Sequence, residues 1–207
     1  MAVPVGVKVD CTVSQRGISH TWSGYAYGRF SNWTTQFEAG SAMVTLAAAG
    51  GGAPLLSVSV ELTPGPLVLA LRADNSKGLG HYWPPTKRSL EPIAASYVPS
   101  AAHTAGVRLF NFSPDTRFAG MKSSQVATAL ATNVPYSLGS DHWAQIEPGQ
   151  VSLAAFDALS QKVLGAVDAE PPLSPSASTL FLLGTQGDPA YPTRVVLVED
   201  APLHGKA

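Results

Sequence analysis

The chain has 207 residues, enough for one large domain or two small ones. Only 13% of its residues are charged, about half the share typical of soluble domains, and the formal net charge is −1. This balance excludes the basic footprint of nucleic-acid or anionic-membrane binding, and no apolar run reaches the length of a membrane span. The 19 glycines and 17 prolines favour short strands joined by turns over long helices.

The single cysteine, Cys11, cannot form an internal disulfide and has no cysteine partners for a zinc site. We expect a thiol packed in a strand, with an intermolecular disulfide as the alternative. The N-terminal sequence lacks the basic start and apolar core of an intact signal peptide. Two interpretations stay open, a cytoplasmic protein or a mature or shortened form of an exported one.

In the first half, alternating apolar residues predict strands, and Gly50 to Gly52 mark a hairpin tip. The apolar segment LVLAL, residues 67–71, predicts a strand covered on both faces. Residues 15–31 and 72–90 are predicted to be turn-rich segments that carry aromatic side chains. The other predicted strands cover residues 3–13, 42–48, 56–62 and 90–98.

The second half opens with residues 107–115, VRLFNFSPD, which alternate as a strand should. Val107 and Leu109 are predicted to point to one face, and Phe110 and Phe112 to the other. The strand is expected to stop at the turn signal Ser-Pro-Asp of residues 113–115. Further strands are predicted over residues 125–134, 151–157, 162–167, 179–183 and 193–199.

The two halves present the same order of elements. AMVTLAA at 42–48 corresponds to VSLAAFD at 151–157, and LVLAL at 67–71 corresponds to TLFLL at 179–183. The pattern predicts an all-β chain of two tandem Ig-like antiparallel β-sandwich domains. Their predicted bounds are residues 1–100 and 101–207. The alternative is that short strands and Gly/Pro turns recur in any all-β protein.

The second half resembles the small secreted β-sandwich domains of unknown function. The residues that carry the resemblance are Val107, Arg108, Asn111, Ser113, Pro114, Asp115, Ile146, Pro148, Gly149, Leu173 and 179–184. The two-copy layout is similar to the AlgF family, the periplasmic accessory proteins of bacterial alginate O-acetylation. This resemblance implies a periplasmic or extracellular adaptor among the acetyltransferases that modify an exopolysaccharide, without catalytic activity of its own.

No catalytic residue, metal site or cofactor is predicted. Ser140, Asp141 and His142 have the residue types of a hydrolase triad, but adjacent side chains of an extended strand diverge. The histidines lack the spacing of metal ligands, so we expect solvated surface residues. The five histidines are His20, His81, His103, His142 and His204.

Aromatic side chains are the best candidates for binding, because their faces stack on sugar rings and anchor protein interfaces. The predicted binding residues are His81, Tyr82, Trp83, Trp22 and Tyr25. The alternative is that aromatic residues form the core, which we expect for Trp33 and Phe37.

The preferred hypothesis is a non-enzymatic adaptor in cell-envelope exopolysaccharide O-acetylation or export, with protein partners. The second is a carbohydrate-binding β-sandwich module. The third is a self-assembling, capsid-like or surface protein, because a low charge suits surfaces that neighbouring copies cover. An enzyme with a convergent site is the hypothesis that the sequence supports least.

Overall fold

The computed structural model describes residues 3–29, 37–64, 67–72, 74, 83–94, 104–169 and 176–200. Their regular structure is β-strand, apart from one 3₁₀ turn, η2 (Lys87–Ser89), so the all-β prediction is confirmed. The chain divides into two compact units. Unit 1 comprises Met1–Ser96 with Pro189–Tyr191, and unit 2 comprises Tyr97–Asp188 with Pro192–Ala207.

The predicted linker at residues 99–106 lies partly outside the described residues, which resume at residue 104. The predicted domain bounds therefore stay a prediction. No helix in the described part of the chain has the length and apolarity that crossing a bilayer requires.

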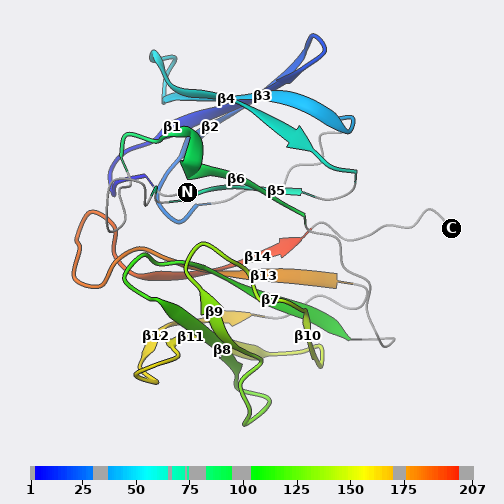
Figure 1. Cartoon of the computed structure of the whole chain (residues 1–207), viewed down its shortest axis with the longest axis vertical. Helices are drawn as coiled ribbons and strands as arrows, with labels where there is room; N and C mark the ends of the chain where they lie inside the picture. The colour runs from blue at the N-terminus through cyan, green and yellow to red at the C-terminus, as the bar shows by residue number, and fades with distance from the viewer. Residues whose placement is uncertain are drawn as a thin grey trace, which may run out of the picture. The chain divides into compact units, whose positions relative to one another are not determined.

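Unit 1 contains a four-stranded antiparallel sheet in the order β2-β1-β3-β4 (Figure 1). A second sheet pairs β5 with β6, also antiparallel. The strands of this unit are β1 (Val9–Gln15), β2 (Ile18–Tyr25), β3 (Gly40–Ala48), β4 (Pro54–Leu62), β5 (Leu67–Leu71) and β6 (Leu90–Ala94).

One face of the four-stranded sheet is buried and the other carries hydroxyl groups. On β1, Val9, Cys11 and Val13 are buried because side chains alternate with a period of two. On the opposite face, hydroxyls of neighbouring strands pair with one another instead of with charged groups. The paired oxygens are Thr12–Thr21 at 2.8 Å, Ser14–Ser19 at 2.9 Å, Ser41–Ser59 at 2.6 Å and Thr45–Ser57 at 3.2 Å.

Two predictions for unit 1 need correction. Strand β2 lies where the sequence predicted a turn-rich segment, because an edge strand that is mostly exposed shows only weak apolar alternation, here Ile18 and Trp22. Strand β5, predicted to be covered on both faces, has only Leu71 buried, and its other four residues are half-buried.

Cys11 is a free, buried thiol, as expected, and burial raises its pKa to about 11. At pH 8 we expect native Cys11 to react with a thiol reagent roughly 100-fold more slowly than in denaturant, because only the thiolate reacts. Ellman's assay with and without guanidinium measures both rates. Equal rates in the two conditions would contradict the buried position.

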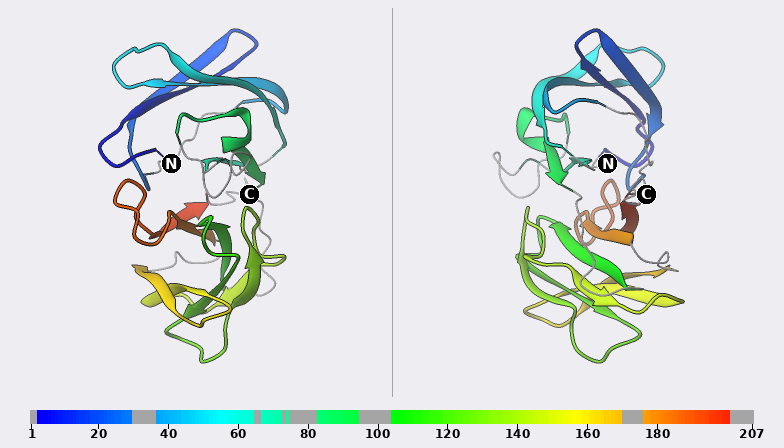
Figure 2. Two further views of the ribbon diagram at one scale, coloured as in Figure 1. Left: turned by 60° about the vertical axis from the view of Figure 1, so that its left-hand side comes forward. Right: turned by 90° about the vertical axis from the view of Figure 1, so that its right-hand side faces the viewer.

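Unit 2 is a β-sandwich of two four-stranded sheets, in the orders β10-β7-β13-β14 and β12-β11-β8-β9 (Figures 1 and 2). Its core draws on both sheets, with Leu109 and Leu180 from one and Met121 and Leu153 from the other, all fully buried. The strands are β7 (Ala105–Phe112), β8 (Phe118–Ser123), β9 (Ala131–Pro135), β10 (Ala144–Ile146), β11 (Val151–Asp157), β12 (Val163–Ala169), β13 (Ser176–Leu183) and β14 (Arg194–Asp200).

Strand β7 is buried along its whole length. Val107 and Leu109 enter the core, and the predicted alternation puts Phe110 and Phe112 on the opposite face. There the two rings meet Phe181 of β13, with all three centroid distances between 5.7 and 5.8 Å. The pairing of β7 with β13 is parallel, which the prediction of antiparallel sandwiches did not include. Strands buried on both faces are typical of parallel pairs.

A network of hydrogen bonds from polar side chains stabilises the β7–β8 turn. The Asn111 amide donates to Thr116 O at 2.8 Å and Val134 O at 3.2 Å, and its Oδ1 accepts from Ser113 N at 3.1 Å. Ser113 Oγ lies 2.7 Å from Gly184 O. The carboxylate of Asp115 accepts from Gln186 N at 2.8 Å. This polar network therefore joins the β7–β8 turn to the segment that follows β13.

Four strands of unit 1 and four of unit 2 share one order, β2-β1-β3-β4 and β9-β8-β11-β12. Likewise β5 pairs with β6 as β13 pairs with β14. The segments matched in the sequence, 42–48 with 151–157 and 67–71 with 179–183, lie on corresponding strands of this order. The Ig-like tandem arrangement itself stays a prediction.

Candidate functional site

Of the predicted binding residues, Trp22 lies on β2 and is half-buried. Tyr25, at the end of the same strand, is only 7% exposed and packs in the core, so it is not part of the surface described next. Trp83 is half-buried in the segment that leads to η2. His81 and Tyr82 lie outside the described residues.

An aromatic shelf is formed by Ile18, His20, Trp22 and Phe37. The first three alternate along β2 and therefore share one face. Their partners on β1 in the sheet register are Gln15, Val13 and Cys11, all buried, so the shelf continues the core face of the sheet to its edge. At that edge Ile18 is 54% exposed and His20 is exposed.

The rings of the shelf contact one another. The His20 and Trp22 rings stack with centroids 6.0 Å apart and an interplanar angle of 28°. Phe37 meets His20 edge to face, with centroids 5.7 Å apart and an angle of 86°. These are the separations at which aromatic pairs attract one another. The shelf thus presents an exposed imidazole held between two larger rings.

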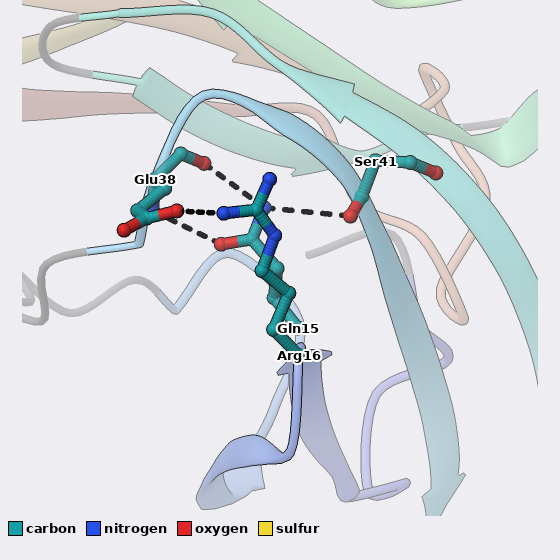
Figure 3. A network of polar contacts seen from close by, with 4 residues as sticks. All are labelled: Gln15, Arg16, Glu38 and Ser41. Atoms are coloured by element: carbon teal, nitrogen blue, oxygen red, sulfur yellow. Dashed lines mark hydrogen bonds and ion pairs between the residues drawn. The ribbon is translucent and has the colours of Figure 1, made fainter.

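Phe37 is held in place through the residue that follows it. The buried side-chain amide of Gln15 donates to Glu38 O at 2.9 Å and accepts from Glu38 N at 2.9 Å. Its nitrogen also lies 3.4 Å from Ser41 O (Figure 3). An amide has both a donor and an acceptor, so Gln15 satisfies the backbone of residue 38 as a neighbouring strand would. This fixes the chain at Phe37 against β2.

An ion pair between Arg16 and Glu38 lies beside these hydrogen bonds of Gln15, which we call the Gln15 clamp (Figure 3). The two side chains are 73% and 71% exposed, so the pair adds little stability. It supplies the shelf with a charged rim at the end where Ile18 lies, next to the β1–β2 turn.

Asp10 anchors the other end of β2. Its Oδ1 accepts from Gly24 N at 2.9 Å and its Oδ2 from Gly50 N at 3.1 Å. These bonds, first that from Gly24, lower the pKa of the carboxyl. Asp10 thereby ties the end of β2 to the tip of the β3–β4 hairpin and keeps the shelf strand in register.

Three of the four shelf residues are not among the predicted binding residues. Ile18 and His20 belong to the segment predicted to be turn-rich. The sequence predicts Phe37 in the core, whereas it is half-buried. The I-x-H-x-W spacing of β2 carries a signal, because residues two apart share a strand face. The contribution of Phe37 has no local signal, since it depends on Gln15.

The serine and histidine of the triad-like sequence are not joined through their side chains in the manner of a catalytic pair. Ser140 Oγ lies 3.1 Å from the backbone oxygen of His142 and accepts from Leu109 N at 3.2 Å, which are turn-stabilising contacts. Within the described ranges, no group of three or more His, Cys, Asp or Glu side chains could hold a metal ion.

The chemistry of the shelf must be inferred from its own residues. No protein-family model matches the chain, and no curated protein matches it. The shelf offers flat aromatic faces, one exposed aliphatic side chain and a rim of paired charges. Such a surface can bind a ring that is apolar on its face and polar at its edge.

Proposed function

We propose that the protein is a non-enzymatic binding module that holds a carbohydrate on the aromatic shelf. Its proposed setting is the modification or export of a cell-envelope exopolysaccharide. The observation that carries the proposal is the exposed ring of His20, stacked on Trp22 and bordered by Phe37.

A sugar ring has an apolar face of C–H groups and a polar rim of hydroxyls, and both features have counterparts here. The exposed ring of His20, which Trp22 supports by stacking, can contact the C–H groups. The exposed carboxylate and guanidinium of Glu38 and Arg16 can bond the hydroxyls. The strand and the Gln15 clamp hold these groups before a ligand arrives, which lowers the entropic cost of binding.

The test is isothermal titration calorimetry of the whole chain with three purified polysaccharides: alginate, O-acetylated alginate and a neutral β-glucan. We expect His20→Ala to weaken binding about two- to tenfold, because an aromatic contact contributes roughly 0.5–1.5 kcal/mol. His142→Ala is the matched control, since His142 is an exposed histidine of unit 2. Absence of binding to all three polysaccharides, or unchanged affinity in His20→Ala, would contradict the proposal.

A second candidate function is the adaptor role, and the tip of the β11–β12 hairpin favours it. Leu159 at this tip is 70% exposed, the most exposed large apolar side chain of the described residues. Asp157 Oδ1 accepts from Leu159 N at 3.0 Å and Ser160 N at 2.7 Å. The Ser160 bonds are the main cause of the lowered pKa of Asp157. A rigid tip that displays a leucine is a typical protein-binding element.

The adaptor role can be tested with a purified polysaccharide O-acetyltransferase immobilised on a sensor surface. Binding that is lost in Leu159→Ser but retained in Val126→Ser, a change at another exposed apolar residue of unit 2, would favour this role. Equal binding by both variants would place the contact elsewhere.

A further inference from the structure

We propose that β2 pairs antiparallel with β2 of a second copy of this chain, about a two-fold axis at His20. The pairing would join two four-stranded sheets into one of eight strands. This inference rests on the edge of the sheet and its side chains, and it is independent of carbohydrate binding.

Strand β2 has the features of an edge open to pairing. It ends the order β2-β1-β3-β4, and among the described strands it pairs with β1 alone. Its residues from Ile18 to Thr21 are all exposed. Its eight residues, ISHTWSGY, include no charged residue and no proline, the devices that commonly prevent edge pairing.

The strand is complementary to itself when the two-fold axis passes through His20. With the axis at His20, Trp22 lies opposite Ile18 of the second copy, an apolar pair on the shelf face. Thr21 lies opposite Ser19 of the second copy, a hydroxyl pair on the other face. The same hydroxyl face already joins β2 to β1, through Thr12–Thr21 at 2.8 Å and Ser14–Ser19 at 2.9 Å. A shift by one residue would put Ile18 opposite Thr21 or Ser23, so the pairing keeps shelf-face residues opposite shelf-face residues.

The pairing brings no charged side chains of β2 together. The eight residues of the strand carry no charged group. The Arg16–Glu38 ion pair lies at the two-residue turn between β1 and β2, beyond the end of the paired strand.

The pairing would also place the two shelves side by side on one face of the joined sheet. Ile18, with its exposed fraction of 54%, would be covered by Trp22 of the second copy. The contact spans only a short ladder, and small interfaces are typical of weak, concentration-dependent association. We therefore expect a dimer that dissociates on dilution through the micromolar range.

Sedimentation velocity of the full chain, over a series of concentrations and without any polysaccharide, tests the inference. We expect a concentration-dependent shift from monomer to dimer. His20→Lys should weaken the dimer at least about tenfold, because it puts like charges directly opposite each other. His142→Lys, which makes the same change at an exposed histidine of unit 2, should leave it unchanged. A monomer at all concentrations would overturn the proposal, as would a dimer that His20→Lys does not weaken.

A second measurement tests which β2 residues of the two copies lie opposite each other. His20→Cys should form an intermolecular disulfide under mild oxidation, because directly opposite strand residues approach to disulfide distance. Ser19→Cys should not, since its opposite residue is Thr21. Cys11 is buried and does not compete. A disulfide formed equally by both variants would indicate random collision and count against the pairing. Association without cross-linking through residue 20 would point to a different surface and also overturn it.

Discussion

Asn111→Ala is expected to lower the free energy of unfolding by about 3 kcal/mol, because it leaves several buried backbone groups without partners. Asn111 is fully buried, and its amide serves Thr116 O, Val134 O and Ser113 N. Alanine supplies neither donor nor acceptor, and the three backbone groups have no route to water. A loss of this size is a large share of the stability of an ordinary domain.

Urea denaturation followed by tryptophan fluorescence measures this loss. Thr132→Ala is the matched control, because Thr132 is an exposed residue of β9 near the same turn; we expect it to change the unfolding free energy by less than about 0.5 kcal/mol. If Asn111→Ala and Thr132→Ala have the same free energy of unfolding, the polar network at the β7–β8 turn does not contribute to stability.

Gly120→Ala is expected to destabilise the protein by about 2 kcal/mol through overpacking. Gly120 of β8 lies opposite Phe156 of β11 in the sheet register. A Cβ added at Gly120 would come within 2.6 and 2.7 Å of the Cε2 and Cε1 atoms of the Phe156 ring. The ring covers the glycine directly, so it must shift away from a well-packed position before alanine can fit.

A double-mutant cycle separates this clash from the general cost of changing a strand glycine. Phe156→Leu removes the ring that alanine would meet, so the loss caused by Gly120→Ala should be smaller in the Phe156→Leu background. Thermal unfolding of the four proteins of the cycle gives the coupling energy. Strictly additive losses would show that the ring is not the cause.

Predictions from alternation succeeded where a strand buries at least one face. Val107 and Leu109 enter the core of unit 2 as the sequence indicated, and Cys11 is packed between Val9 and Val13 on a buried face. In both strands the apolar residues alternate with a period of two, and this alternation indicates which residues are buried. Strand β2 was not predicted, because it is mostly exposed and its alternation is weak, with Ile18 and Trp22 as the apolar residues of one face.

Most of the candidate site could not be read from local sequence. Trp22 was identified from its residue type, but its neighbour Phe37 joins the shelf only because Gln15, 22 residues earlier, clamps the backbone of residue 38. Tyr25 has the same kind of side chain as the predicted binding residues and yet is buried. Residue type cannot distinguish these cases, because exposure depends on what the rest of the unit places over each ring.

The amino-acid sequence by itself determined that the chain is all-β, where several of its strands and turns lie, and that Cys11 is a packed thiol. These properties follow from alternation and turn chemistry within a few residues of each position. The tertiary structure alone decided that β2 is an edge, that β7 pairs in parallel with β13, and that His20, Trp22 and Phe37 form one surface. The physical reason is that strand pairing and exposure depend on contacts between segments distant in the chain, which no local pattern encodes.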